Sequence, residues 1–134
     1  MDMERINPSG LARPSGFSHA VSAPAGQLVF LAGQLGQDRD GRVVPGGMVA
    51  QFEQALSNVL AALAAAGGHP SDLASLTIYL TDVDDYQAKG GEIGAVWRRL
   101  AGSDYPAMAG VGVTRLWLPE AVVEIQGIAV VSRS

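Results

Sequence analysis

The sequence contains no cysteine, which excludes disulfide bonds, thiolate nucleophiles and cysteine-ligated metal sites. Its two histidines, His19 and His69, lie far apart and show no metal-ligand spacing. No apolar run is long enough to span a bilayer, and the polar, acidic N-terminus lacks the pattern of a secretory signal. These absences predict a cytoplasmic protein with no metal, no cofactor and no membrane partner.

Charged residues are also scarce, at 16% of the 134 residues, and their balance is acidic, with a net charge of −4. The nine basic residues are scattered, and only Arg98 and Arg99 are adjacent. A surface that follows a phosphate backbone needs clustered positive charge, so nucleic acid is not an expected partner. The length fits one domain over residues 1–134. Hydrophobic residues reach 48%, which predicts that some apolar surface meets another subunit.

The first half of the chain predicts two strands and a helix. Residues 18–23 and 27–34 have β-forming composition, and Pro24, Ala25 and Gly26 between them predict the turn of a hairpin. From residue 48 to 66, apolar residues recur with a helical period, while Gln51 and Asn58 fall elsewhere on the wheel. This segment is therefore expected to be an amphipathic helix with one buried face.

The second half predicts another helix between three strands. Residues 72–81 alternate between apolar and polar, which is typical of a strand with one buried face. A helical pattern follows Asp82 as far as Leu100, and Gly90 and Gly91 predict a kink in it. Strands are expected at 107–116 and 121–131. The element order β-β-α-β-α-β-β predicts a mixed sheet with both helices on one face.

The sheet face without helices is expected to carry small and apolar residues that would be wet in a monomer. This face is predicted to pack against other copies of the chain, as a homotrimer. The residues assigned to it are Met108, Gly110, Gly112, Val122 and Ile128.

Glu124 places a carboxylate inside the otherwise apolar run 121–131. A buried charge costs several kcal/mol unless it is paired, hydrogen-bonded or protonated. Two interpretations are open. Strand alternation could turn Glu124 and Gln126 to the wetter face of a half-buried strand, or Glu124 could belong to a functional site.

Short motifs occur in order along nearly the whole chain. They are Asn7-Pro8-Ser9-Gly10-Leu11, Gly16-Phe17-Ser18-His19-Ala20-Val21, Leu31-Ala32-Gly33-Gln34, Gln54-Ala55-Leu56-Ser57-Asn58-Val59, Thr77-Ile78-Tyr79, Tyr105-Pro106-Ala107 and Val123-Glu124-Ile125-Gln126-Gly127-Ile128-Ala129-Val130. This set resembles the RidA/YjgF family. The resemblance implies a trimeric α+β domain of chorismate-mutase-like fold.

The resemblance also implies a reaction. Active members of the family hydrolyse enamines and imines, such as 2-iminopropanoate, to a 2-oxo acid and ammonia in clefts between subunits. Glu124 matches the glutamate that handles the attacking water, Phe17 the pocket aromatic and Gly33 the glycine of the Gly-Gln turn. An arginine that clamps the substrate carboxylate follows the Pro-Ala pair, here Pro106 and Ala107.

That arginine is replaced by Met108. Methionine carries no charge and no donor, whereas a guanidinium gives a carboxylate two charge-assisted hydrogen bonds. Met108 is equally well interpreted as a core residue. Arg115 does not substitute for the arginine on a regular strand, because it lies an odd number of residues away and would face the opposite side.

Two functions therefore remain open. The chain could be a weak or altered imine hydrolase that uses Glu124 beside Gly33, Phe17, Ala107 and Met108. Alternatively, it could be a trimer that binds a metabolite or another protein without catalysis. Relatives have also been described as ribonucleases or translation inhibitors, and the acidic composition does not favour either description.

Overall fold

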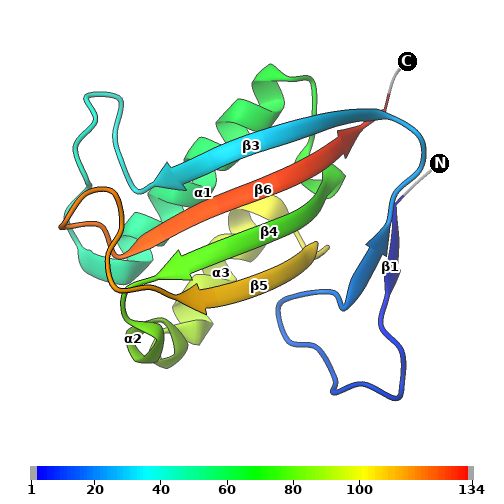
Figure 1. Ribbon diagram of the computed structural model, residues 1–134, viewed down its shortest axis with the longest axis horizontal. Helices are drawn as coiled ribbons and strands as arrows, with labels where there is room; N and C mark the ends of the chain where they lie inside the picture. The colour runs from blue at the N-terminus through cyan, green and yellow to red at the C-terminus, as the bar shows by residue number, and fades with distance from the viewer. Residues whose placement is uncertain (1–2, 133–134) are drawn as a thin grey trace.

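A four-stranded mixed β-sheet with helices packed on one face forms the body of the protein (Figure 1). The computed structural model describes residues 3–132, so the two residues at each end of the predicted 1–134 domain lie outside the described residues. Across the sheet, the strands run β3 (Gln27–Leu35), β6 (Val123–Val131), β4 (Leu73–Leu80) and β5 (Ala107–Gly112). Strand β6 is antiparallel to both of its neighbours, while β4 and β5 are parallel. The predicted mixed α+β architecture is confirmed.

The helices occupy the positions that their apolar periods predict. Helix α1 spans Gly47–Ala65 and buries the stripe of Phe52, Leu56, Val59 and Leu63 against the sheet. The second helical region is divided into α2 (Val83–Ala88) and α3 (Gly90–Ala101). The break falls immediately before the glycine pair, so the predicted interruption is confirmed. A short 3₁₀ turn, Pro70–Asp72, links α1 to β4.

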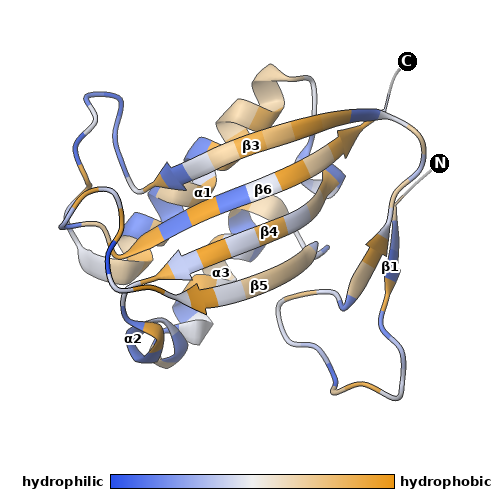
Figure 2. Cartoon of the chain, viewed as in Figure 1, coloured by the Kyte–Doolittle hydropathy of each residue, from blue (hydrophilic) through white to orange (hydrophobic). Residues whose placement is uncertain are grey.

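The two faces of the sheet differ in what covers them. On β4, Leu76, Ile78 and Leu80 are buried beneath the helices, and the alternate residues face the other way. The helix-free face exposes large apolar side chains: Phe30 is 72% exposed and Leu28 is 58% exposed. Figure 2 shows apolar and polar residues alternating at the start of β6, while β3 is apolar over most of its length. An apolar face of this kind is unusual on a monomer.

The predicted hairpin of residues 18–23 with 27–34 is wrong. Strand β2 (Ala20–Ser22) pairs instead with β1 (Glu4–Ile6), a strand that the sequence did not indicate, and β3 pairs with β6. Strand β6 offers β3 a nine-residue apolar partner on the main sheet, whereas β2 is only three residues long. The longer ladder satisfies more backbone groups and buries more apolar surface.

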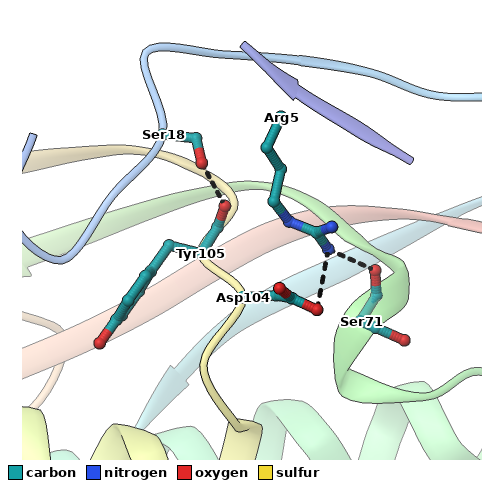
Figure 3. A network of polar contacts seen from close by, with 5 residues as sticks. All are labelled: Arg5, Ser18, Ser71, Asp104 and Tyr105. Atoms are coloured by element: carbon teal, nitrogen blue, oxygen red, sulfur yellow. Dashed lines mark hydrogen bonds and ion pairs between the residues drawn. The ribbon is translucent and has the colours of Figure 1, made fainter. Parts of the chain in front are cut away.

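The N-terminal β1–β2 arm is attached to the body by polar contacts (Figure 3). The Arg5 guanidinium donates to the Ser71 carbonyl at 3.2 Å and lies 3.8 Å from the Asp104 carboxylate. The Ser18 hydroxyl donates to the Tyr105 carbonyl at 2.7 Å. These contacts hold the segment around Phe17 beside the start of β5.

The helix-free face has a different composition from the one predicted, chiefly because of strand β5. It ends at Gly112 instead of residue 116, and Met108 pairs with Leu76, so both side chains face the helices. Gly110 and Gly112 share that direction by alternation. Val122 precedes β6 and packs against the core, which leaves Ile128 as the one predicted residue on the helix-free face.

Candidate functional site

Glu124 lies in an open groove of about 870 Å³ on the helix-free face of the sheet. The side chain is half-buried and belongs to β6, where its neighbours across the ladders are Leu35 on β3 and Tyr79 on β4. The groove is lined by Gly33, Leu35, Gln37, Tyr79, Arg115, Leu116, Trp117, Glu124 and Gln126. The strand alternation that places Glu124 outside the core therefore also places it in a groove.

Gly33 determines how the carboxylate sits. The register of β3 against β6 shifts between Leu31 and Gln34, and this irregularity brings Gly33 against the end of the Glu124 side chain. A Cβ atom at position 33 would overlap the carboxylate, since it would lie only 2.9 Å from Glu124 Cδ. Glycine at this position lets the carboxylate lie against the β3 backbone.

Polar groups extend the site along the groove. Tyr79, which pairs with Glu124 across the ladder, donates its hydroxyl proton to Gln126 Oε1 at 2.9 Å, two residues beyond Glu124 on β6. Arg115 also lines the groove. The argument from strand alternation that set Arg115 aside does not apply, because β5 ends at Gly112 and Arg115 lies in the following loop. The groove thus holds one carboxylate and one guanidinium.

Helix α1 fixes the segment that precedes Glu124 in the sequence. Gln51 is only 5% exposed, and its side chain donates to the Glu120 carbonyl at 3.2 Å and accepts from the Val122 N–H at 2.9 Å. The expectation that Gln51 lies away from the buried side of the helix is wrong. Its amide satisfies two backbone groups just before β6 begins, and so it positions the start of that strand.

Asn58, also on α1, binds backbone groups at the other wall of the groove. Its side-chain amide donates to the Leu35 carbonyl at 3.2 Å and to the Gln37 carbonyl at 2.9 Å, while its Oδ1 accepts from Gln54. The motif that contains Gln54 and Asn58 was visible in the sequence, but its role was not. Only the packing of α1 against the end of β3 reveals these contacts.

The other predicted site residues lie at the sheet edge formed by β5. The Ser18 N–H donates to the Pro106 carbonyl at 3.0 Å, so the segment after Phe17 runs beside Ala107. Met108 points to the helix side of this edge, where it lines a separate cavity of about 290 Å³. Within one protomer, the structure brings Glu124 and Gly33 together and places Met108 on the opposite side of the sheet.

The described chain, residues 3–132, holds no cluster of three or more histidine or acidic side chains that could bind a metal ion. Over the same range, no helix combines the length and the apolar character needed to cross a bilayer. The groove itself presents a carboxylate, an arginine and neutral polar side chains. A carboxylate that faces a groove can accept a proton from water and return it to a nitrogen.

Comparison with known proteins adds to this geometry. The endoribonuclease L-PSP family model matches residues 10–131. A RutC family protein, PH0854 of Pyrococcus horikoshii, is 37% identical over 114 residues, which cover 84% of this chain and 85% of the relative. A protein of Capra hircus named 2-iminobutanoate/2-iminopropanoate deaminase is 36% identical over 106 residues, which cover 78% of this chain and 73% of the relative.

A solved structure agrees with these sequence matches. The crystal structure of the Rid-family protein YyfB from Yersinia pestis superposes with a TM-score of 0.86 at 32% identity, and the match covers 98% of this chain and 100% of that chain. The chain therefore belongs to the endoribonuclease L-PSP family, the RidA/YjgF family that its sequence motifs indicated.

Proposed function

We propose that this protein hydrolyses the C=N bond of a small imine or enamine metabolite, giving a carbonyl compound and ammonia. The observation that supports this best is the position of Glu124. Its carboxylate is half-buried in the groove, lies against Gly33 and forms no ion pair within residues 3–132. The relative from Capra hircus, 36% identical, is named a deaminase of 2-iminobutanoate and 2-iminopropanoate.

The chemical step needs one carboxylate and one water molecule. Glu124 accepts a proton from the water as its oxygen attacks the imine carbon, and the C=N bond becomes a C–N single bond. Glu124 passes this proton to the nitrogen, which gives a carbinolamine. It then takes the hydroxyl proton of the carbinolamine and delivers it to the nitrogen as the C–N bond breaks, so that the carbonyl forms and both water protons leave with the nitrogen. The water oxygen ends in the product, and nitrogen leaves as ammonia.

The working cleft is proposed to lie between subunits of a homotrimer. Glu124 and Met108 face opposite sides of the sheet, so one substrate can contact both only if they come from different subunits. In this arrangement, Glu124 and Gly33 come from one subunit. Phe17, Ala107 and Met108, which lie along β5 and its edge, come from the neighbouring subunit. The exposed apolar side chains of the helix-free face support such contacts.

Met108 is expected to change the specificity of this cleft. The family resemblance implies an arginine at position 108, whose guanidinium would bind the substrate carboxylate. The thioether of Met108 offers no charge to that carboxylate. A bidentate charged contact is worth on the order of 2–4 kcal/mol, and a three-carbon imino acid has few other groups to bind. Taken alone, this substitution favours slow turnover of 2-iminopropanoate or a preference for larger, less acidic imines. The same substitution favours metabolite binding without catalysis as a second candidate function.

The test uses Glu124→Gln, which keeps the shape of the side chain and removes its proton transfer. Imino acids are generated freshly by an amino-acid oxidase, and formation of the 2-oxo acid is measured for both proteins. We expect the variant to fold like wild type and to lose about 100-fold or more in rate. Equal turnover would show that Glu124 is structural. Absence of turnover in wild type on every imine tested would favour the binding function.

A further inference from the structure

The cavity beside Met108 carries a positive charge of its own. It measures about 290 Å³ and lies between α2, α3 and β5, with Phe52, Ile93 and Met108 among its apolar walls. Arg98 also lines it. We propose that this cavity binds the carboxylate of a small 2-oxo or 2-imino acid, and that Arg98 supplies the charge that Met108 lacks. This inference rests on the proposed function, because it assigns the acid group of the substrate to this wall of the cleft.

The position of Arg98 leaves its guanidinium available to a ligand. Arg98 lies one turn after Gly94 on α3, and a Cβ atom at position 94 would be 3.2 Å from Arg98 Nη1. Because Gly94 has no side chain, the Arg98 guanidinium can lie over the helix surface at that position. Arg98 forms no ion pair within residues 3–132, whereas the next residue, Arg99, lies 2.7 Å from the Glu53 carboxylate.

A second donor in the cavity wall has no acceptor. Trp97 is 4% exposed, and its indole Nε1 is buried without a hydrogen-bond partner in the part of the chain that is described. Trp97 lines the same cavity as Arg98. Buried N–H groups in folded proteins are almost always paired with protein, water or ligand.

Tyr86 adds a third donor. It lines the cavity, and burial raises its pKa to about 12, so it keeps its hydroxyl proton at physiological pH. Among residues 3–132, no aspartate or glutamate lines the cavity. A small space with one cation, neutral donors and apolar walls fits a monoanion with a short apolar chain. The volume is close to the lower end for ligand pockets, which suits the acid end of a substrate and a short chain.

The test measures binding of 2-oxobutanoate, a stable keto acid, by isothermal titration calorimetry. We expect Arg98→Gln to raise the Kd by about 10-fold to 100-fold, which corresponds to the loss of one charge-assisted contact. Arg99→Gln removes the neighbouring charge on the same helix turn outside this cavity and is the matched control, with an expected change below about twofold. Butanone, which lacks the carboxylate, should not distinguish wild type from Arg98→Gln.

Two results would overturn the inference. One is an equal Kd for wild type and Arg98→Gln, and the other is no binding of 2-oxobutanoate to wild type at millimolar concentration. The two proposals fail separately. If Glu124→Gln keeps full turnover while Arg98→Gln still weakens binding, only the catalytic role of Glu124 fails. If Glu124→Gln is inactive and Arg98→Gln changes neither Kd nor KM, only the role of Arg98 fails.

Discussion

Gly33 shows how a single residue can control the geometry of the groove. Its backbone is not in the left-handed region, so nothing in its φ angle requires glycine. What requires glycine is the Glu124 carboxylate, which occupies the space that a side chain would fill. A substitution at position 33 therefore tests the placement of the carboxylate more directly than it tests the fold.

We predict that Gly33→Ala lowers imine hydrolysis by about 10-fold or more, because a displacement of about 1 Å in a catalytic group is enough for such a loss. Thermal stability should change by less than about 1 kcal/mol, since the atoms displaced belong to the end of a flexible side chain. Rates and melting curves are compared with those of Gly110→Ala. A Cβ atom at position 110 would meet nothing within 4 Å. Equal rates for both variants would contradict the placement of Glu124.

At the scale of elements, helix α1 does more than cover the sheet. Its apolar stripe packs on the core, while Gln51 and Asn58 bind backbone groups on the two sides of the groove. These amides connect the helix to the loop before β6 and to the end of β3. Helix α1 therefore fixes the start of β6 and the end of β3, the two strands that carry Glu124 and Gly33.

We predict that Gln51→Leu destabilises the protein by about 1–3 kcal/mol, because it leaves the Val122 N–H and the Glu120 carbonyl without their partner. Hydrolysis should also fall, since the start of β6 is no longer held. Chemical denaturation and rate measurements check both effects. The control is Glu53→Gln on the same helix, which weakens an exposed ion pair with Arg99 worth at most about 1 kcal/mol. A loss no larger than that of the control would refute the positioning role.

At the scale of the whole molecule, the helix-free face determines the expected assembly. Leu28, Phe30 and Ile128 are exposed there, while Glu124 and Gln126 lie nearer the start of β6. A monomer would keep this apolar surface in contact with water. Burial between copies would cover it and would also enclose the groove.

We predict a homotrimer in dilute solution, with a mass by light scattering close to three times the 13.9 kDa of one chain. Phe30→Glu should shift the mass toward the monomer, because Phe30 is 72% exposed and a carboxylate in its place would be desolvated in the interface. Glu92→Gln, an exposed change on α3, is the control and should keep the mass of wild type. A monomeric mass for wild type at micromolar concentration would contradict the trimer.

Local sequence patterns determined the elements of this protein and pointed to its family. The helical period of residues 48–66, the alternation of 72–81 and the glycine pair after Lys89 each predicted an element or a break that the structure confirms. These signals succeed because they depend on neighbours within one or two turns or strand steps. The ordered motifs likewise indicated the family and the candidate role of Glu124.

Long-range packing decided the rest. The pairing of β2 with β1 and of β3 with β6 depends on which remote segment offers the longer apolar ladder, and no local pattern encodes that choice. The direction of Met108 follows from the register of β5 against β4. The burial of Gln51 and the presence of Arg98 in the Met108 cavity follow from how helices pack on the sheet. Tertiary contacts thus determined which polar side chains meet, because each of these contacts joins residues that are distant in sequence.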